Sequence, residues 1–224
     1  MNVVITGTSR GIGSELVKLF LDAKYQVTGV SRSEVFQDAV MYRHIQCDLE
    51  SSTEVQKMVK EIKGTLDRID ILIHNAADFV KHPFEELTDL MWKKMFEVNL
   101  FAPVEITKGL LTLMGGLTPS HIVFISSMAG FQGSEKFPGL SAYAASKGAV
   151  TSLTECLATE FKEKNIYVNS LALGAVHTQM LGGAFPGLQE AMGVREVAEG
   201  IFQFSLRGYK TFNGKVLPMA LGTP

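Results

Sequence analysis

The sequence is short of the residues that define several common protein classes. Its two cysteines, Cys47 and Cys156, form neither a CxxC pair nor a metal-spaced set with any of the five histidines. A disulfide framework and a metal site are therefore not expected. A reducing, cytoplasmic setting is expected instead. No run of about 18 apolar residues occurs, and the N-terminus lacks the basic flank and apolar stretch of a signal peptide. The sequence predicts neither secretion nor a membrane-spanning segment.

Excess charge is also missing. The chain has 21 Lys and Arg against 23 Asp and Glu, a net charge of −2, and this balance disfavours a nucleic-acid-binding surface. What is present is a globular composition, with 46% hydrophobic residues in 224, enough to build a full core. No internal repeat, low-complexity segment or linker divides the chain, so residues 1–224 are expected to form a single domain.

Short apolar runs bounded by polar or small residues recur along the chain and predict strands that are buried on both faces. They are Val3–Ile5, Val27–Val30, His44–Cys47, Ile71–His74, Ile122–Ser126, Tyr167–Leu173 and Lys215–Met219. Apolar residues at helical spacing predict the intervening helices. These cover about Ile12–Phe20, Ser52–Arg68, Leu87–Leu113, Ala142–Lys164 and Glu196–Leu206. The alternation predicts an α/β fold of the Rossmann type, a doubly wound, mainly parallel seven-stranded sheet with helices on both faces.

A glycine-rich turn, Thr6-Gly7-Thr8-Ser9-Arg10-Gly11-Ile12-Gly13, separates the first predicted strand from the first predicted helix. Its glycines allow backbone N–H groups to approach a pyrophosphate at the helix N-terminus. Glycine marks any tight turn, so the strand before it and the helix after it carry the argument. The turn predicts nucleotide binding at the carboxyl ends of the strands.

Tyr143 and Lys147 are four residues apart on a predicted helix, so both side chains leave the same face. An adjacent ammonium favours a phenolate and lowers the pKa of a tyrosine toward a range useful for proton transfer. A YxxxK spacing also occurs in ordinary amphipathic helices that carry a tyrosine and a solvated lysine. The pair alone leaves both readings open.

The glycine turn and this pair together resemble the short-chain dehydrogenase/reductase family, whose TGxxxGxG and YxxxK patterns they match. The resemblance covers about residues 3–180. It extends to Asn99 in Val98-Asn99-Leu100 and to a serine pair before Gly130, where alignment on the glycine selects Ser127 over Ser126.

The resemblance implies an oxidoreductase that transfers a hydride between a nicotinamide and a carbonyl or alcohol substrate. Tyr143 would be the general acid in reduction and the general base in oxidation. Ser127 would bind the substrate oxygen. Lys147 would lower the pKa of Tyr143 and hold the nicotinamide ribose, and Asn99 would position a water that links Lys147 to solvent.

The cofactor is expected to be NADP(H) rather than NAD(H). An acidic residue about 20 positions beyond the glycine turn holds the ribose of NAD, whereas an arginine there accommodates the 2′-phosphate of NADP. Here Ser31 stands at that position and Arg32 follows it, while Arg10 adds a second cation. Glu34 keeps NAD possible, and both arginines have the alternative of being solvated surface charges.

The resemblance also implies a set of cofactor contacts along the chain. They are Gly7, Ser9, Arg10, Gly11, Ile12, Gly13, Ser31, Arg32, Asp48, Leu49, Asn75, Ala76, Tyr143, Lys147, Gly174, Val176 and Thr178. Asp48 has the alternative of a helix-capping or loop acid. Two positions depart from the family pattern, since Ala77 replaces a glycine after the fourth strand and Leu173 replaces a proline before Gly174.

The substrate is expected to be a small carbonyl or alcohol, with an apolar or aromatic compound as the first guess. Candidate pocket residues, each with a core or subunit contact as the alternative, are Met128, Phe131, Phe137, Leu140, Met180 and Phe185. The segment Gln179–Gly193 is short for a lid over this pocket.

Other functions and an assembly are also considered. A catalytically silent NADP(H)-binding sensor would keep the fold but would not need all four catalytic-type residues. A related isomerase or dehydratase usually carries an added substrate domain that this length does not allow. A homodimer or homotetramer is expected, and the helix with Val150, Leu153 and Leu157 is a candidate for its interface.

Overall fold

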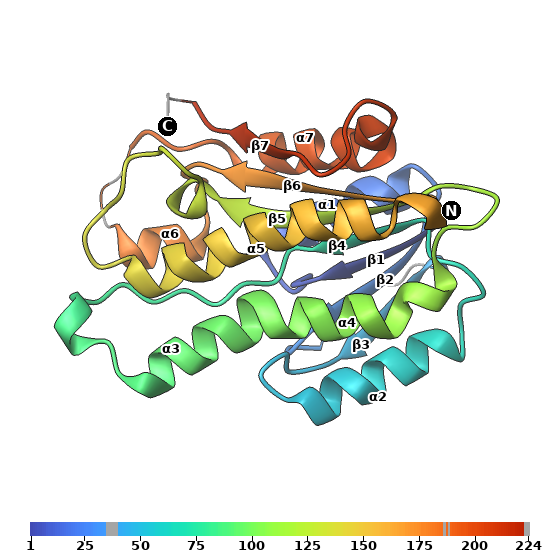
Figure 1. The fold of residues 1–224 in the computed structure, drawn as a ribbon, viewed down its shortest axis with the longest axis horizontal. Helices are drawn as coiled ribbons and strands as arrows, with labels where there is room; N and C mark the ends of the chain where they lie inside the picture. The colour runs from blue at the N-terminus through green and yellow to red at the C-terminus, as the bar shows by residue number, and fades with distance from the viewer. Residues whose placement is uncertain (35–39, 186, 188, 222–224) are drawn as a thin grey trace.

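A computed structural model describes residues 1–34, 40–185, 187 and 189–221. Its seven strands form one sheet in the order β3-β2-β1-β4-β5-β6-β7, and all six neighbouring pairs are parallel (Figure 1). The strands are β1 Asn2–Thr6, β2 Gln26–Ser31, β3 Tyr42–Gln46, β4 Ile71–His74, β5 Ser120–Ser127, β6 Ile166–Leu173 and β7 Val216–Met219. The predicted seven-stranded Rossmann-type fold is confirmed.

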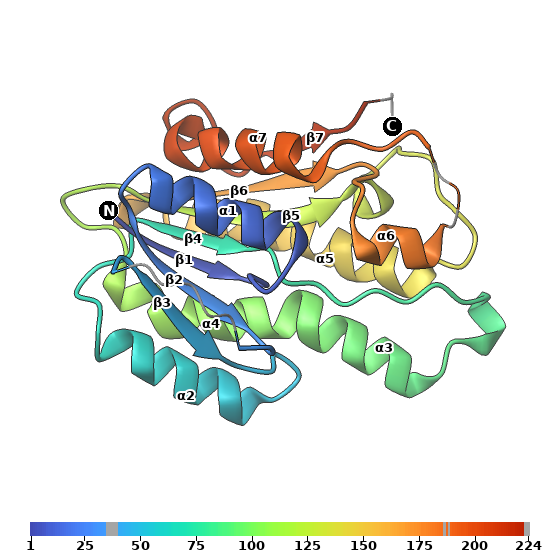
Figure 2. The ribbon, with the colours of Figure 1, turned by 180° about the vertical axis from the view of Figure 1, so that it is seen from behind.

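Helices cover both faces of the sheet. The helices are α1 Gly11–Asp22, α2 Ser52–Lys63, α3 Asp89–Phe96, α4 Ala102–Leu110, α5 Ser141–Glu160, α6 Gln179–Ala184 and α7 Val194–Arg207. One core cluster unites residues of α2, α4 and α5 with the sheet, and the other unites residues of α1 and α7 with the opposite face (Figures 1 and 2). Along the described ranges, no helix is long and apolar enough to cross a bilayer.

The central strands are apolar throughout because helices cover them on both sides. All four residues of β4 are buried, as are the first seven of β5. Side chains of a strand alternate between the faces, so Val4 and Leu72 pack in the first cluster while Ile5 and Ile73 pack in the second. This two-sided burial produces the continuous apolar runs that the sequence shows.

Two helical segments differ from expectation. The helix predicted for Leu87–Leu113 is interrupted, because Glu97–Phe101 winds as a π-helical segment, η2, between α3 and α4. Such a segment places one extra residue in a turn and shifts the side chains that follow. The short helix α6 falls within the Gly- and Ala-rich stretch that carried no helix prediction.

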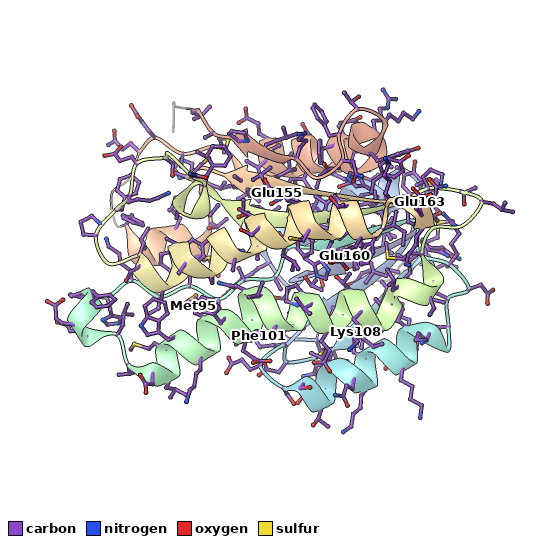
Figure 3. The ribbon with its side chains drawn as sticks, viewed as in Figure 1. Met95, Phe101, Lys108, Glu155, Glu160 and Glu163 are labelled. Atoms are coloured by element: carbon purple, nitrogen blue, oxygen red, sulfur yellow. The ribbon has the colours of Figure 1, made fainter. Side chains whose placement is uncertain are left out.

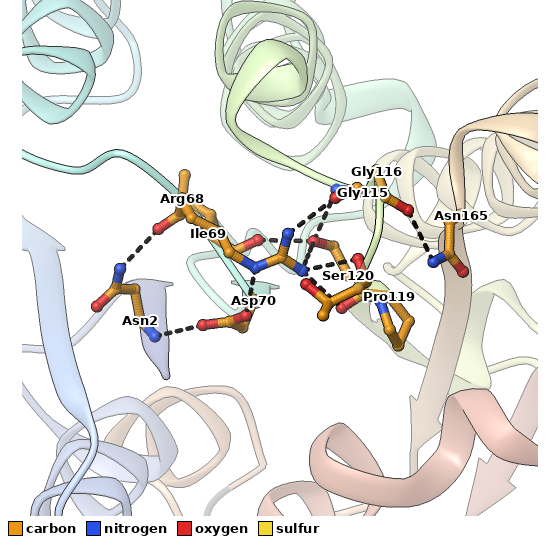
Figure 4. Close-up of polar contacts among 10 residues, drawn as sticks. Asn2, Arg68, Ile69, Asp70, Gly115, Gly116, Pro119, Ser120 and Asn165 are labelled. Carbon is orange, nitrogen blue, oxygen red and sulfur yellow. Dashed lines mark hydrogen bonds and ion pairs between the residues drawn. The ribbon is translucent and has the colours of Figure 1, made fainter.

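Hydrogen bonds of one arginine connect segments at the amino-terminal ends of the strands (Figure 4). Arg68 donates to the Asp70 carboxylate at 2.7 Å and to the backbone carbonyls of Gly115 and Thr118, each at 2.8 Å. Asp70 in turn accepts from the amide of Asn2 at 2.7 Å. One guanidinium therefore links the starts of β1 and β4 to the loop before β5.

Candidate active site

A cavity of about 1090 Å³ opens at the carboxyl ends of the strands. Strand β1 lies between β2 and β4, so the chain reverses its direction of sheet growth there, which is where ligands of doubly wound sheets bind. The cavity is lined by every predicted cofactor contact except Gly13, and by Ser127. Asn99 lies outside the lining, buried in η2.

The glycine turn has the conformation that a phosphate cradle requires. Gly7 and Gly11 have positive φ angles of 76° and 58°, which side chains other than hydrogen rarely allow. A Cβ atom on Gly13 would lie 2.1 Å from the carbonyl oxygen of Gly7, so this glycine allows the helix to pack closely against the turn. Arg10 is the N-cap of α1 and makes no side-chain cap, which leaves the first amides of that helix for an anion.

Asn75 joins the loop after β4 to the glycine turn. Its side-chain amide donates to the carbonyl oxygens of Thr6 at 3.0 Å and Gly7 at 3.1 Å, and the Thr6 hydroxyl accepts from the amides of Asn75 and Ala76. Ala77 is not among the residues with positive φ, so the glycine that it replaces is not needed. The loop keeps its place despite this departure.

The ends of β2 and β3 form the other end of the cavity. Ser31 is buried there, and Arg32 and Glu34 are exposed beside it. Asp48 lines the cavity. Its carboxylate also has a local role, because it accepts a hydrogen bond from the amide of Glu50 at 3.1 Å. Arg10 extends across the cavity edge and donates to the side chain of Gln179 on α6 at 3.2 Å.

Strand alternation separates the two serines at the end of β5. The Ser126 hydroxyl turns to α5 and donates to the carbonyl oxygen of Lys147 at 3.1 Å. The Ser127 hydroxyl turns to the cavity, where it hydrogen-bonds Tyr143 and accepts from the amide of Ala129 at 3.2 Å. Ser127 is thus the serine that meets the tyrosine.

Tyr143 and Lys147 occupy successive turns of α5, as their spacing predicted. The Lys147 ammonium lies 5.8 Å from the centre of the Tyr143 ring and donates to the carbonyl oxygen of Ile125 at 2.9 Å. Burial lowers the pKa of Lys147 to about 8. Burial also raises the pKa of Tyr143, and the hydrogen bond from Ser127 opposes this shift. The lowering of the Tyr143 pKa that was expected from Lys147 is absent. Loss of hydration on burial is the largest effect on the Tyr143 pKa, and burial also disfavours the charged form of Lys147.

Asn99 anchors the loop after β4 to the helices. Its side chain accepts from the amide of Asp78 at 2.8 Å, and it donates to the carbonyl oxygen of the same residue at 3.0 Å. A third bond, also 3.0 Å, runs to the hydroxyl of Ser146 on α5. Asn99 therefore binds α5 at the residue directly before Lys147.

The rest of the cavity is lined by apolar and aromatic side chains. Five of the predicted substrate-pocket residues line it, namely Met128, Phe137, Leu140, Met180 and Phe185. Phe131 does not. Phe79 was missed by the sequence analysis although its ring lies edge-on to Tyr143 at 4.8 Å, because nothing in the loop sequence marks its direction.

Phe185 closes one side of this region. Its ring lies 6.2 Å from that of Phe137, and the ammonium of Lys81 lies 3.8 Å from its centre. Pro186 and Leu188 of the predicted Gln179–Gly193 lid segment lie outside the described residues. Across the part of the chain that is described, no three His, Cys, Asp or Glu side chains gather as metal ligands do.

Comparisons with known proteins place the chain in a family. The sequence profile described as short chain dehydrogenase matches residues 1–188. A 2-dehydro-3-deoxy-D-gluconate 5-dehydrogenase from Pseudoalteromonas atlantica is 30% identical over 185 residues, which cover 78% of this chain and 72% of that protein. For other relatives of about 31% identity, the match spans 58% of their length.

Solved structures agree over nearly the whole chain. The structure of 4-hydroxyisoleucine dehydrogenase complexed with NADH has a TM-score of 0.86 and 25% identity, and covers 99% of this chain and 97% of that one. ElxO with NADP bound has a TM-score of 0.85 and 28% identity, covering 97% and 96%. These two neighbours carry different nicotinamide cofactors.

Proposed function

The chain belongs to the short-chain dehydrogenase/reductase family, oxidoreductases that act on alcohols and carbonyls with a nicotinamide cofactor, and we propose that it is an NADPH-dependent carbonyl reductase that uses Tyr143. The observation that carries the proposal is the meeting of Ser127 and Tyr143 inside the cavity that the glycine turn also lines. Residues 1–224 would act as one dinucleotide-binding catalytic domain.

The residues of the cavity divide the reaction between them. A bound nicotinamide supplies the hydride. Ser127 donates a hydrogen bond to the carbonyl oxygen of the substrate, and Tyr143 gives that oxygen a proton as negative charge develops on it. Lys147 would hold the nicotinamide ribose, and its ammonium lies 5.8 Å from the centre of the Tyr143 ring. Asn99 holds the loop and helix in register and positions a water toward Lys147.

The preference for NADP(H) follows from the charges at the ends of β2 and of the glycine turn. Arg32 and Arg10 both line the cavity, and no carboxylate occupies position 31. A 2′-phosphate gains a charge-assisted contact from an arginine, whereas a ribose hydroxyl lacks the acidic partner that NAD-binding sites provide. Arg32→Asp should shift the preference toward NAD(H), and an unchanged ratio of affinities contradicts the assignment.

The apolar lining supports a substrate class. Phe79, Phe137 and Phe185 line the cavity on the side of Tyr143, and Met128 and Leu140 add to that surface. Rings of this kind contribute mainly by burying apolar area and by edge-to-face contacts. We infer a small carbonyl compound with an apolar or aromatic substituent.

A second copy of the chain is the proposed partner, and a cytoplasmic setting the proposed location. Val150 is buried in the core of its own chain, whereas Leu153 and Leu157 are only partly buried against it, so an interface on this helix stays a prediction. The exposed candidates are Phe101, which is 53% exposed, and Val104 at the start of α4. Figure 3 shows Phe101 and Lys108 on the same side of the molecule as Glu155 and Glu160 of α5.

The experiment that tests the function has two steps. NADPH and NADH are titrated into the protein by fluorescence, and a panel of carbonyl compounds is then followed at the cofactor absorbance. Tyr143→Phe should bind NADPH as the parent does and lose roughly 100-fold to 10,000-fold in turnover. Tyr25→Phe, a tyrosine outside the cavity lining, is the matched control.

The outcomes separate the alternatives. NADPH binding with turnover that depends on Tyr143 supports the reductase. Binding without turnover across the panel favours the sensor, and near-normal turnover of Tyr143→Phe removes this residue from the mechanism. Failure to bind either cofactor contradicts the proposal as a whole.

A further inference from the structure

Ser31 has two polar neighbours at the end of β2. It lies about 20 positions beyond Gly11, where a dinucleotide-binding site contacts the adenosine ribose, and it lines the cavity. Its hydroxyl oxygen is 2.9 Å from the carbonyl oxygen of Ser33 and 2.9 Å from Nε2 of His44 on β3. His44 is not itself part of the cavity lining.

The proton count of this group fixes the roles of its members. A serine hydroxyl has one proton and a carbonyl oxygen only accepts, so the proton of Ser31 goes to Ser33. The contact with His44 is then a hydrogen bond only if Nε2 of His44 carries a proton and donates it. His44 therefore holds the Ser31 oxygen as a donor in its neutral and in its charged form.

Among the residues that the structure describes, few other groups act on His44. Glu34 is the described charged group that raises its pKa, while partial burial lowers it by a larger amount. On β3 itself, the Tyr42 ring lies 6.5 Å from the imidazole, and Arg43 binds Glu61 of α2 at 2.8 Å. Arg32 is the cation that borders the same end of the cavity.

We propose that His44 is a positioning residue that acts through Ser31 to select a cofactor with a 2′-phosphate. The proposal rests on the proposed NADP(H)-dependent function. Because His44 donates to the Ser31 oxygen, the Ser31 hydroxyl can turn from Ser33 to a phosphate oxygen without losing its place. A protonated His44 adds a second cation next to Arg32, and a dianionic phosphate favours that form.

A dependence on pH follows from linkage between the two equilibria. If phosphate binding favours the protonated imidazole, protonation must favour phosphate binding to the same degree. The preference for NADP⁺ over NAD⁺ therefore rises as the pH falls through the titration range of His44. The 2′-phosphate itself takes up a proton near neutral pH and works in the opposite direction, so a variant is needed to separate the two effects.

The test compares dissociation constants for NADP⁺ and NAD⁺ between about pH 5 and about pH 8, the range in which histidines titrate. His44→Gln retains a side-chain N–H donor but cannot become charged. His82→Gln is the matched control, because His82 is half-exposed outside the cavity and pairs with Glu86. The imidazole signals of His44 in NMR spectra are followed in the same range with and without each cofactor.

The expected result is a preference for NADP⁺ that rises about fivefold more in the parent and in His82→Gln than in His44→Gln as the pH falls, a factor at the lower end of typical linkage. The NMR pKa of His44 should rise with NADP⁺ and not with NAD⁺. Parallel curves for parent and His44→Gln, with an NMR pKa that NADP⁺ leaves unchanged, overturn the role of His44 while the reductase proposal stands. If neither cofactor binds, or if NAD⁺ binds more tightly than NADP⁺, both the inference and the NADP(H) assignment are overturned.

Discussion

At the scale of single residues, the two serines at the end of β5 show how adjacent identical side chains serve different ends. Ser126 and Ser127 point to opposite faces because successive strand residues alternate. Ser126 donates to the backbone of α5, whereas Ser127 hydrogen-bonds Tyr143. Family alignment selected Ser127, and the geometry gives the physical reason for that choice.

Ser127→Ala should therefore lower turnover by roughly 100-fold to 1,000-fold, the usual effect of removing one donor to a developing oxyanion. Its affinity for NADPH and its free energy of unfolding should change little. Steady-state kinetics and urea denaturation provide the measurement. Turnover close to that of the parent contradicts the role assigned to Ser127.

Ser126→Ala is the matched control. It removes the buried hydrogen bond to the Lys147 carbonyl and should lower the free energy of unfolding by about 1 kcal/mol. Its turnover should stay within a few-fold of the parent because its hydroxyl binds the Lys147 carbonyl oxygen and not Tyr143. A variant pair with the two effects exchanged would show that the serines have been assigned to the wrong faces.

At the scale of elements, the amino-terminal edge of the sheet depends on one side chain. Arg68 joins the Asp70 carboxylate and two loop carbonyl oxygens far from the cavity (Figure 4). Removing a donor from partly buried acceptors leaves them unsatisfied, and this costs more than the bond itself contributed. We expect Arg68→Ala to lower the free energy of unfolding by about 1–3 kcal/mol without changing the affinity for NADPH.

The control for this prediction is Arg195→Ala. Arg195 pairs with Glu199 on the surface of α7, where the side chains are 76% and 52% exposed. Solvent screens an exposed pair of this kind almost completely, so the control should be almost neutral. If urea denaturation gives equal losses for the two variants, the network does not fasten the edge.

The elements that the sequence predicted well are those whose signal is local. The run Ile71–His74 is buried on both faces and is apolar for that reason, so its ends were predicted to the residue. The interruption of the Leu87–Leu113 helix was not predicted, because η2 keeps helical periodicity on both sides of Asn99. Helix α6 was hidden by glycines that the sequence treats as breakers.

The parts of the site that escaped prediction depend on contacts between distant segments. Asn99 binds both backbone groups of Asp78, 21 positions away, and no local pattern reveals that partnership. Ser31 meets His44 across neighbouring strands, and its sequence position indicates only the ribose site. The pKa of Tyr143 was predicted from Lys147 alone, whereas burial by the whole cavity determines its direction.

At the scale of the whole molecule, two buried histidines link stability to pH. Burial lowers the pKa of His74 to about 3 and that of His121 to about 4. His121 contacts the carbonyl oxygen of Ser205 and accepts from the side chain of Asn169, each at 3.0 Å, an arrangement that suits the neutral ring. A proton on its second nitrogen would oppose the Asn169 donor.

The sign of the effect follows from these shifts. Above about pH 6.5 both rings are neutral in the folded and the unfolded chain. Below this pH only the unfolded chain takes up protons, so the free energy of unfolding decreases as the pH is lowered. Each histidine should contribute a slope of roughly 1.4 kcal/mol per pH unit between about pH 6 and about pH 5. In urea denaturation, the slope of the free energy of unfolding against pH should be smaller for His121→Gln than for the parent by one such contribution. An unchanged slope shows that His121 titrates normally.

The assembly state belongs to the same scale. The exposed Phe101 lies on the same face of the molecule as Lys108 of α4 and Glu155 and Glu160 of α5, and Val104 precedes Lys108 by one turn of α4. One twofold axis can therefore bring opposite charges and apolar groups together. We expect light scattering to give a multiple of the chain mass for the parent and the single-chain mass for Phe101→Asp. Phe84→Asp is the control and should remain associated, because Phe84 is also an exposed phenylalanine but lies in the single-turn 3-10 helix Phe84–Glu86 before α3.

The strand order also divides the chain in the order of its synthesis. Strands β1, β2 and β3 are complete once residue 46 has left the ribosome. They border the glycine turn and the end of the cavity at Ser31. Tyr143 and Lys147 follow about a hundred residues later, and β1 gains its second neighbour only with β4. A growing chain thus makes its nucleotide cradle before it has any means of reaction. The cofactor, bound across the junction of β1 and β4, would then hold the early and the late parts of the chain together.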